Sequence, residues 1–358
     1  MLNSIFKNLK VIELANVLAG PATGMFFAEL GAHVIKVENK QSGGDLTRSW
    51  KAPGEAVAGS VSAYYGAANW GKDVLLLDLK TNEGRQEVYA LIRNADIVIT
   101  NFRAGEGEKL GMSYETLKGL NKRLIVGNIN AYGESDSRAG FDLVLQAETG
   151  FMGMNGTPES GPLKMPVALI DLLAAHQLKE ALLLALIQRM ETGEGCRVTV
   201  SLFEAAIASL ANQASNYLTA GFIPGLSGSL HPNIAPYGER LRMKDGKQVV
   251  LAIGNNKQFA SLCRLLGMSD LATDTRFAEN TSRVSNRALL CKLLEAEALK
   301  LDAAGFLDAA DKLGVPAGMI ASLDELFTKQ EAQAMIREEV REGQKLRCVS
   351  TIAFRGEP

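Results

Sequence analysis

The sequence has few of the residues that build metal centres or disulfide frameworks. It contains only three histidines and four cysteines, the latter at Cys196, Cys263, Cys291 and Cys348. The cysteines lie far apart and form no CxxC pair, so neither a zinc site nor a disulfide scaffold is expected. Scattered cysteines are typical of a reducing compartment, and we expect a cytoplasmic protein without a bound metal.

Long apolar runs and an excess of one charge are also missing. The 38 basic and 40 acidic residues nearly cancel, which excludes a global field that attracts nucleic acid. Glu13 interrupts the first apolar run, so no signal peptide is indicated. The most apolar stretch, residues 165–190, contains Asp171, His176, Lys179 and Glu180, which excludes a membrane span.

The common nucleotide-binding and hydrolase motifs are absent as well. A glycine-containing turn after the apolar run at Val11 is typical of a βαβ unit, but Gly20 and Gly24 form GxxxG rather than GxGxxG. There is no Walker A motif and no G-x-S-x-G elbow. Pro21 suits the first position of a helix. We interpret this segment as a tight turn in a Rossmann-like fold.

The chain has short apolar runs that alternate with helical patterns over its first 200 residues. With 358 residues, 47% of them hydrophobic, it is long enough for a large core. Alternation of this kind predicts an α/β fold with a parallel sheet covered on both faces. The expected strands are at 11–14, 33–38, 74–79, 96–100, 124–129 and 197–201.

The second half changes character after two long helical patterns. These patterns run from Asp171 to Met190 and from Glu204 to Tyr217. Residues 220–236 are rich in Gly, Pro, Ser and Asn and are typical of a linker. A hairpin is expected around Asp245–Gly246, followed by helices from 257 to 313.

Asp171 is a lone carboxylate in an apolar stretch at the start of the longest helical pattern. A buried, unpaired charge costs several kcal/mol, so this group must be satisfied locally, point into a cleft or do chemistry. An aspartate is also favoured in the first turn of a helix for ordinary structural reasons. The residues by themselves leave these alternatives open.

A series of short motifs resembles the family III CoA-transferases, the CaiB/BaiF group that includes formyl-CoA transferase and alpha-methylacyl-CoA racemase. Each motif is short, but their shared order covers nearly the whole chain. The motifs are Leu18–Pro21, Leu30–Glu38, Gly43–Arg48, Asn101–Gly105, Lys109–Met112, Phe141–Ala147, Gly193–Leu202, His231–Tyr237 and Gly314–Gly318.

The resemblance implies a particular architecture. A large Rossmann-like domain would span residues 1–220 and be completed by about 325–358. A smaller α+β domain would span 230–320, with linkers at about 220–230 and 314–330. Relatives form homodimers whose chains interlock, so we expect an interlocked homodimer.

The resemblance also implies a reaction. It matches Asp171 to the family's catalytic aspartate, which attacks an acyl-CoA thioester and forms a mixed anhydride. The released CoA thiolate then forms an aspartyl-CoA thioester, and an acceptor carboxylate reverses the sequence. Coenzyme A would be a substrate rather than a bound cofactor. The expected partners are an acyl-CoA and a small carboxylic acid.

The same resemblance assigns binding residues. Arg103 follows a predicted strand and would lie at the carboxyl end of the sheet, where open α/β folds bind ligands. Phe141 and Glu148 are candidates for the acyl site. Any one of the basic residues, taken alone, could be a solvated surface charge. The full set expected to contact CoA is Val17, Ala19, Lys40, Lys72, Asn101, Phe102, Arg103 and Lys109.

Two alternative functions remain open. A racemase needs two bases that flank an α-carbon, and its branch carries a histidine where this chain has Phe141, which cannot carry a proton. His176 lies five residues after Asp171, about 140° round a helix, and is poorly placed to substitute. A catalytically silent relative that only binds acyl-CoA is the second alternative. The transferase is favoured over both.

Overall fold

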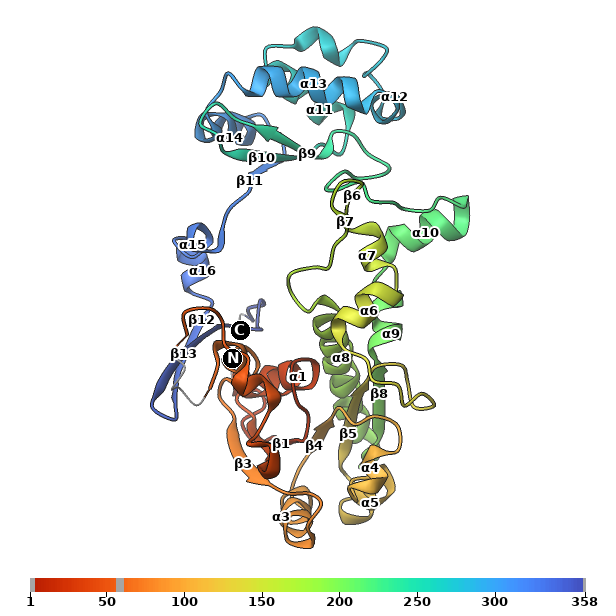
Figure 1. The fold of residues 1–358 in the computed structure, drawn as a ribbon, viewed down its shortest axis with the longest axis vertical. Helices are drawn as coiled ribbons and strands as arrows, with labels where there is room; N and C mark the ends of the chain where they lie inside the picture. Colours follow the sequence, from red (N-terminus) through yellow and green to blue (C-terminus); the bar gives the residue numbers. More distant parts are fainter. Residues whose placement is uncertain (1–3, 56–60, 357–358) are drawn as a thin grey trace. The chain divides into compact units, whose positions relative to one another are not determined.

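The computed structural model describes residues 4–55 and 61–356, and the chain divides into two compact units (Figure 1). The first unit comprises the described residues of Met1–Phe151, Lys164–Ala220 and Glu331–Pro358. The second comprises Met152–Leu163 and Gly221–Gln330. Within the described ranges, none of the helices combines the length and the apolar character needed to cross a membrane.

The first unit is built on a six-stranded sheet in the order β3-β2-β1-β4-β5-β8, and every neighbouring pair is parallel. The α/β fold with a parallel sheet is thus confirmed. The strands are β1 (Lys10–Glu13), β2 (His33–Asn39), β3 (Asp73–Leu77), β4 (Ile97–Thr100), β5 (Ile125–Asn130) and β8 (Arg197–Ser201).

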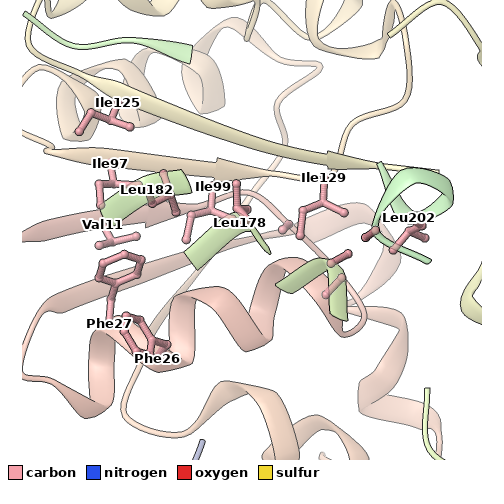
Figure 2. Packing of buried hydrophobic residues seen from close by; sticks show 14 of the residues in the cluster. Val11, Phe26, Phe27, Ile97, Ile99, Ile125, Ile129, Leu178, Leu182 and Leu202 are labelled. Atoms are coloured by element: carbon pink, nitrogen blue, oxygen red, sulfur yellow. The ribbon is translucent and has the colours of Figure 1, made fainter. Parts of the chain in front are cut away.

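Helices cover both faces of this sheet. Along β1, Val11 belongs to the core cluster on one face and Ile12 to the cluster on the other, as the alternation of a strand requires. Figure 2 shows Phe26 and Phe27 beside Val11 on the first face. The helices packed there are α1 (Ala19–Glu29), α8 (Leu169–Thr192) and α9 (Leu202–Ala208), whereas α3 (Asn82–Ile92) and α5 (Tyr114–Leu120) cover the second face.

The GxxxG glycines allow α1 to lie directly against the β1 segment. A Cβ on Gly20 would lie 2.3 Å from the Ala15 Cβ, and one on Gly24 would lie 1.8 Å from Oε2 of Glu13. The motif therefore serves close packing of helix and strand. The expectation for Pro21 was wrong by two residues, because it is the third residue of α1. Proline is tolerated there since the first-turn N–H groups have no partner within the helix.

A second local prediction was also wrong. The single helix expected over Glu204–Tyr217 is two helices, α9 and α10 (Ala211–Ala220). Ala211 has a positive φ of 48°, a conformation that cannot continue a right-handed helix. The remaining elements of this unit are η2 (Lys40–Ser42), η3 (Leu46–Ser49), α2 (Ala63–Asn69), α4 (Glu106–Lys109), α6 (Asp142–Glu148) and the hairpin of β12 (Ile336–Arg341) and β13 (Gln344–Val349).

The second unit has its own core around a three-stranded antiparallel sheet in the order β11-β10-β9. The hairpin expected at Asp245–Gly246 is confirmed, with Gly246 at φ 82°. The strands are β9 (Tyr237–Arg242), β10 (Gln248–Ala252), β11 (Ala317–Met319) and the short pair β6 (Gly156–Thr157) and β7 (Gly161–Pro162). The helices are α11 (Asn256–Leu265), η4 (Ser269–Ala272), α12 (Asn280–Ser285), α13 (Arg287–Ala298), α14 (Ala303–Lys312) and α15 (Leu323–Leu326). Two short helices, α7 (Phe151–Met154) and α16 (Gln330–Gln333), cross the boundaries between the units.

Candidate active site

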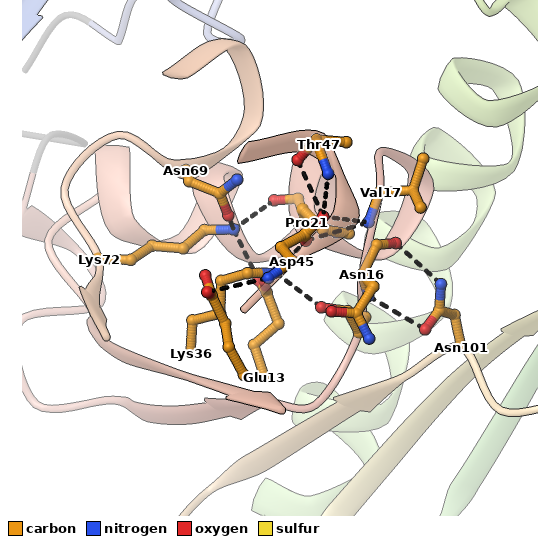
Figure 3. Close-up of polar contacts among 12 residues, drawn as sticks. Glu13, Asn16, Val17, Pro21, Lys36, Asp45, Thr47, Asn69, Lys72 and Asn101 are labelled. Carbon is orange, nitrogen blue, oxygen red and sulfur yellow. Dashed lines mark hydrogen bonds and ion pairs between the residues drawn. The ribbon is translucent and has the colours of Figure 1, made fainter. Parts of the chain in front are cut away.

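The sheet has a topological switch point between β1 and β4. From β1 the chain extends the sheet to β2 and β3 on one side, and from β4 to β5 and β8 on the other. The loops that follow β1 and β4 therefore diverge, which opens a crevice at the carboxyl ends of the strands. Asn101 joins these loops: its Nδ2 donates to the Asn16 carbonyl at 2.9 Å, and its Oδ1 accepts from the Asn16 amide at 3.1 Å (Figure 3).

The backbone of Val17 has an unusual conformation in this crevice. Its φ is 71°, a region that β-branched residues rarely adopt. The Val17 amide donates to both carboxylate oxygens of Asp45, at 3.1 and 3.3 Å, and this contact holds the strained conformation (Figure 3). The Asp45 carboxylate thus fixes the backbone of Val17 in the wall of the crevice.

Asp45 belongs to a network of four buried charges. The Lys36 ammonium lies 3.0 Å from Glu13 Oε1 and 3.0 Å from Asp45 Oδ2, and the Lys72 ammonium lies 2.7 Å from Glu13 Oε2 (Figure 3). All four side chains are fully buried or nearly so. Two lysines and two carboxylates balance in charge, which offsets the desolvation that each one suffers. The network ties β1, β2 and the start of β3 to the crevice wall.

Asp171 faces a cavity of about 290 Å³ at this switch point. It is the third residue of α8 and is 9% exposed. Burial, followed by the nearby negative charge of Asp142, raises the pKa of Asp171 to about 7. The cavity is lined by residues 16–19, Asn101, Arg103, 129–131, 139–141, Asp171 and Leu202.

The Asp171 carboxylate receives no hydrogen bond from residues 4–55 or 61–356. Its neighbour Asp142 takes the helix amides instead: Asp142 Oδ1 accepts from the Ile170 N–H at 2.7 Å and from the Asp171 N–H at 3.4 Å. The N-cap residue Ala168 has no side chain that could do so. Asp171 is therefore a poorly solvated carboxylate at the wall of a cavity, which suits a nucleophile or a base.

A comparison with known families identifies the family of the chain. The family model of CoA-transferase family III matches residues 6–355. The chain belongs to CoA-transferase family III.

Relatives in this family support the assignment over most of the chain. The succinate–glutarate CoA-transferase of Agrobacterium fabrum is 41% identical over 335 residues, which cover 91% of this chain and 82% of the relative. The acetyl-CoA:oxalate CoA-transferase of Acetobacter aceti is 34% identical, with 89% and 82% covered. A CaiB/BaiF family protein from Brucella suis has a crystal structure with a TM-score of 0.84 and 39% identity, covering 98% of this chain and 93% of that one.

In this family III CoA-transferase the fold gathers many of the sequence-predicted residues around one cavity. Asp171, Val17, Ala19, Asn101, Arg103 and the acyl-site candidate Phe141 all line it. Phe102 lies next to it, partly buried against the second core cluster, and lines a neighbouring cavity of about 250 Å³. The two cavities share Asn16 and Asn101.

The other predicted residues lie elsewhere. Lys40 and Lys109 are exposed and are not among the residues that line these two cavities. Lys72 is buried, and its ammonium donates to Glu13, to Asn69 and to the Pro21 carbonyl. Glu148 is exposed and lies 3.9 Å from Arg138. The predicted contact of Lys72 with CoA stays a prediction. The three hydrogen bonds that the Lys72 ammonium already donates within the protein do not favour it.

Sequence reasoning missed two residues near Asp171. Asp142 stands inside the Phe141–Ala147 motif, and its place next to an acyl-site candidate was a signal. Tyr64 of α2 had no such signal. Burial raises the pKa of Tyr64, with further contributions from the negative charges of Asp171, Asp142 and Asp45. Its phenol therefore lies within electrostatic range of Asp171.

Proposed function

We propose that this enzyme moves CoA from an acyl-CoA thioester to a free carboxylic acid, with Asp171 as the covalent nucleophile. The Asp171 oxygen attacks the thioester carbonyl, the C–S bond breaks, and CoA leaves as a thiolate. The thiolate then attacks the aspartyl carbonyl of the mixed anhydride, which releases the donor acid and leaves an aspartyl-CoA thioester. The acceptor acid repeats these steps in reverse, and Asp171 is regenerated.

The observation that carries the proposal is the environment of Asp171. The carboxylate is almost buried, faces a cavity and has no hydrogen-bond donor in the described part of the chain. Poor solvation makes a carboxylate more nucleophilic, and a cavity that excludes water protects the anhydride from hydrolysis. Membership in CoA-transferase family III supplies the reaction class.

We assign CoA to the two adjoining cavities, which share Asn16 and Asn101. We place the adenosine end in the cavity of about 250 Å³ beside Lys80, and the pantetheine arm in the cavity that holds Asp171. The Asn16–Asn101 pair would lie between the two ends. Arg103 and Lys40 are exposed cations near these cavities and would meet the phosphates.

A dicarboxylic acid of four or five carbons is the acceptor class that we propose. It rests on the relative from Agrobacterium fabrum, whose name gives succinate and glutarate. The acetyl-CoA:oxalate relative is less similar. Mass spectrometry of mixtures of succinyl-CoA with a panel of acids tests this class, and exchange restricted to monocarboxylic acids would reject it.

The interlocked homodimer is likewise a proposal. On α8, Leu184, Ile187 and Met190 are 67%, 55% and 85% exposed and lie three residues apart, so they share one face of the helix. A row of exposed apolar side chains is typical of a surface that another protein covers. Sedimentation of the wild type and of Leu184→Glu tests it: a monomeric wild type would contradict the dimer.

Trapping with hydroxylamine tests the nucleophile. During incubation with an acyl-CoA, hydroxylamine should convert the activated carboxyl of Asp171 into a hydroxamate that peptide mass spectrometry locates. Asp171→Ala should abolish exchange of CoA between acids and leave the circular dichroism spectrum unchanged. Exchange retained by that variant would reject the covalent mechanism, and binding of acyl-CoA without trapping would indicate a silent relative.

Phe141 supports transfer over racemisation. A racemase needs a second proton carrier across the α-carbon, and the side chain at this edge of the cavity is a phenyl ring. Incubation with an α-deuterated acyl-CoA distinguishes the two activities. Exchange of CoA with the deuterium retained is expected, whereas loss of deuterium without exchange would support the racemase.

A further inference from the structure

A chain of hydrogen bonds runs from α6 to the residues just before and at the start of α8. The Met165 N–H donates to Gln146 Oε1 at 2.8 Å, and Gln146 Nε2 donates to Asp142 Oδ2 at 2.6 Å. The other oxygen of Asp142 accepts from the amides of Ile170 and Asp171. We call Asp142 and Gln146 together the α6 clamp.

We propose that the α6 clamp is a positioning device for the nucleophile: it fixes the start of α8 and takes up the backbone amides that would otherwise hydrogen-bond the Asp171 carboxylate. This inference rests on the proposed function of Asp171. Asp142 and Gln146 are positioning residues, because they act through Asp171 and its backbone.

The first turn of a helix explains why such a device is needed. The amides there have no partner within the helix, and an acidic side chain in that turn is stabilised by them and by the helix dipole. An aspartate stabilised in this way is a weaker nucleophile. Here Asp142 already accepts from the Ile170 and Asp171 amides, and the Asp171 carboxylate has no donor in the described ranges. The carboxylate that carries the chemistry is thus left free to react.

Gln146 sets the polarity of the clamp. Its side chain is fully buried, and its carbonyl end faces a donor, the Met165 N–H, whereas its amide end faces an acceptor, Asp142. A glutamate at this position would place a second carboxylate against Asp142. The polarity can be inverted, however: an asparagine at 142 would donate to a glutamate at 146, and that glutamate would still accept from Met165. The negative charge would then lie farther from Asp171.

This inversion gives the experiment its design. Four variants are compared with the wild type: Asp142→Ala, Asp142→Asn, Gln146→Glu, and the double variant Asp142→Asn/Gln146→Glu. The control is Asp302→Ala, which removes the aspartate that caps α14 through the Gly305 amide at 2.8 Å. The measurements are kcat, KM for succinyl-CoA, the pH profile of kcat/KM, and the urea midpoint.

We expect Asp142→Ala to lower kcat about 100-fold with KM within about threefold of wild type, because small misplacements of a reacting group have effects of this size. Asp142→Asn and Gln146→Glu should each lose at least tenfold in kcat. The double variant should recover to within about tenfold of wild type. Asp302→Ala should lower the urea midpoint by about as much as Asp142→Ala does, but its kcat should stay at the wild-type value.

The pH profile separates positioning from simple destabilisation. Among the residues that the structure describes, the titratable groups near Asp171 include Asp142 of α6, Tyr64 of α2 and Arg103 after β4. In the double variant the acid limb of kcat/KM should move to lower pH, because the negative charge beside Asp171 has moved away. A merely structural clamp would leave that limb in place.

Two results would overturn the inference. One is a kcat of Asp142→Ala within about threefold of wild type. The other is a soluble double variant that is no better than Asp142→Asn, with an unmoved acid limb. Asp171→Ala is measured in the same series. Exchange by that variant would reject the nucleophile itself, whereas the two results above would reject only the clamp.

Discussion

The Cβ that Gly24 lacks would lie 1.8 Å from Oε2 of Glu13. The buried Glu13 carboxylate therefore fills the space that a side chain at position 24 would need. Glu13 in turn holds both lysines of the buried network behind the crevice wall. The packing of α1 on β1 and the electrostatics of the active-site wall are therefore coupled at one point.

Gly24→Ala should destabilise the protein despite the higher helix propensity of alanine. The new methyl group must displace Glu13, and overpacking of a buried site costs roughly 1–3 kcal/mol. Gly119→Ala in α5 is the matched control, since a Cβ there meets nothing within 4 Å. It should be neutral or stabilising by up to about 1 kcal/mol. Urea unfolding of both variants measures the difference, and equal stabilities would contradict the coupling.

Asp45→Leu should be strongly destabilising, because it leaves an excess positive charge in the buried network and frees the Val17 amide. Breaking a buried pair in this way costs about 3–5 kcal/mol. The double variant Lys36→Met/Asp45→Leu leaves Glu13 paired with Lys72 and should cost less than the sum of its two single variants. A double-mutant cycle in urea measures this coupling, and strict additivity would disprove it.

The activity should rise with pH through neutrality. Burial and Asp142 raise the pKa of Asp171 to about 7, and only the ionised carboxylate can attack the thioester. The value of kcat/KM should therefore fall below a pH of about 7, because a single group, the Asp171 carboxylate, takes up a proton there. A profile measured from pH 5 to 9 checks this, and a flat profile down to pH 5 would contradict the shifted pKa.

The same pKa shift predicts a cost in stability. In the folded protein the pKa of Asp171 is raised from 3.8 to about 7, so the folded state binds the proton more tightly than the unfolded chain. Ionisation therefore destabilises the fold increasingly from pH of about 4 up to about 7, by at most about 4 kcal/mol at roughly 1.4 kcal/mol per unit. Asp171→Asn should be more stable than wild type at pH 8. The difference should shrink towards pH 5, as urea titrations can determine.

Arg103→Ala should raise KM for acyl-CoA about tenfold with little change in kcat. A charge-assisted hydrogen bond to phosphate contributes about 1.5–3 kcal/mol, and a solvated arginine lies at the low end of that range. The control for the loss of one positive charge is Arg264→Ala, at an exposed arginine of α11 in the second unit. The two KM values, measured at two salt concentrations, check the assignment, and a similar effect of both variants would count against it.

Much of the fold was predictable because buried parallel strands have a simple pattern. The inner strands β1, β4 and β5 are short and mostly buried, and the turns between the strands carry recognisable residues. Helix boundaries were harder. The break between α9 and α10 depends on one alanine with a positive φ, which sequence patterns do not reveal. Nor did the pattern of residues 152–163 indicate that they belong to the second compact unit.

The site was predictable only in part, for a physical reason. Arg103 stood out because it lies inside the Asn101–Gly105 motif, and Asp171 because it is a lone carboxylate in an apolar stretch. Lys72 showed the limit of this reasoning: a sequence cannot distinguish a surface lysine from one whose three partners are buried with it. Asp142 lies 29 residues from Asp171 along the chain, and only the packing of α6 beside α8 brings the two together.

The loop at 16–19 has a consequence for how this enzyme could change its preference for acids. In this part of the cavity lining, the backbone of Asn16 and Val17 is held by Asn101 and Asp45, and the chain continues into α1, whose Gly20 and Gly24 pack closely on the β1 segment. A larger side chain or a shifted backbone in this loop would disturb those contacts. Natural drift or laboratory evolution towards bulkier acids should therefore act on other lining residues, such as Ala139, Phe141 and Leu202.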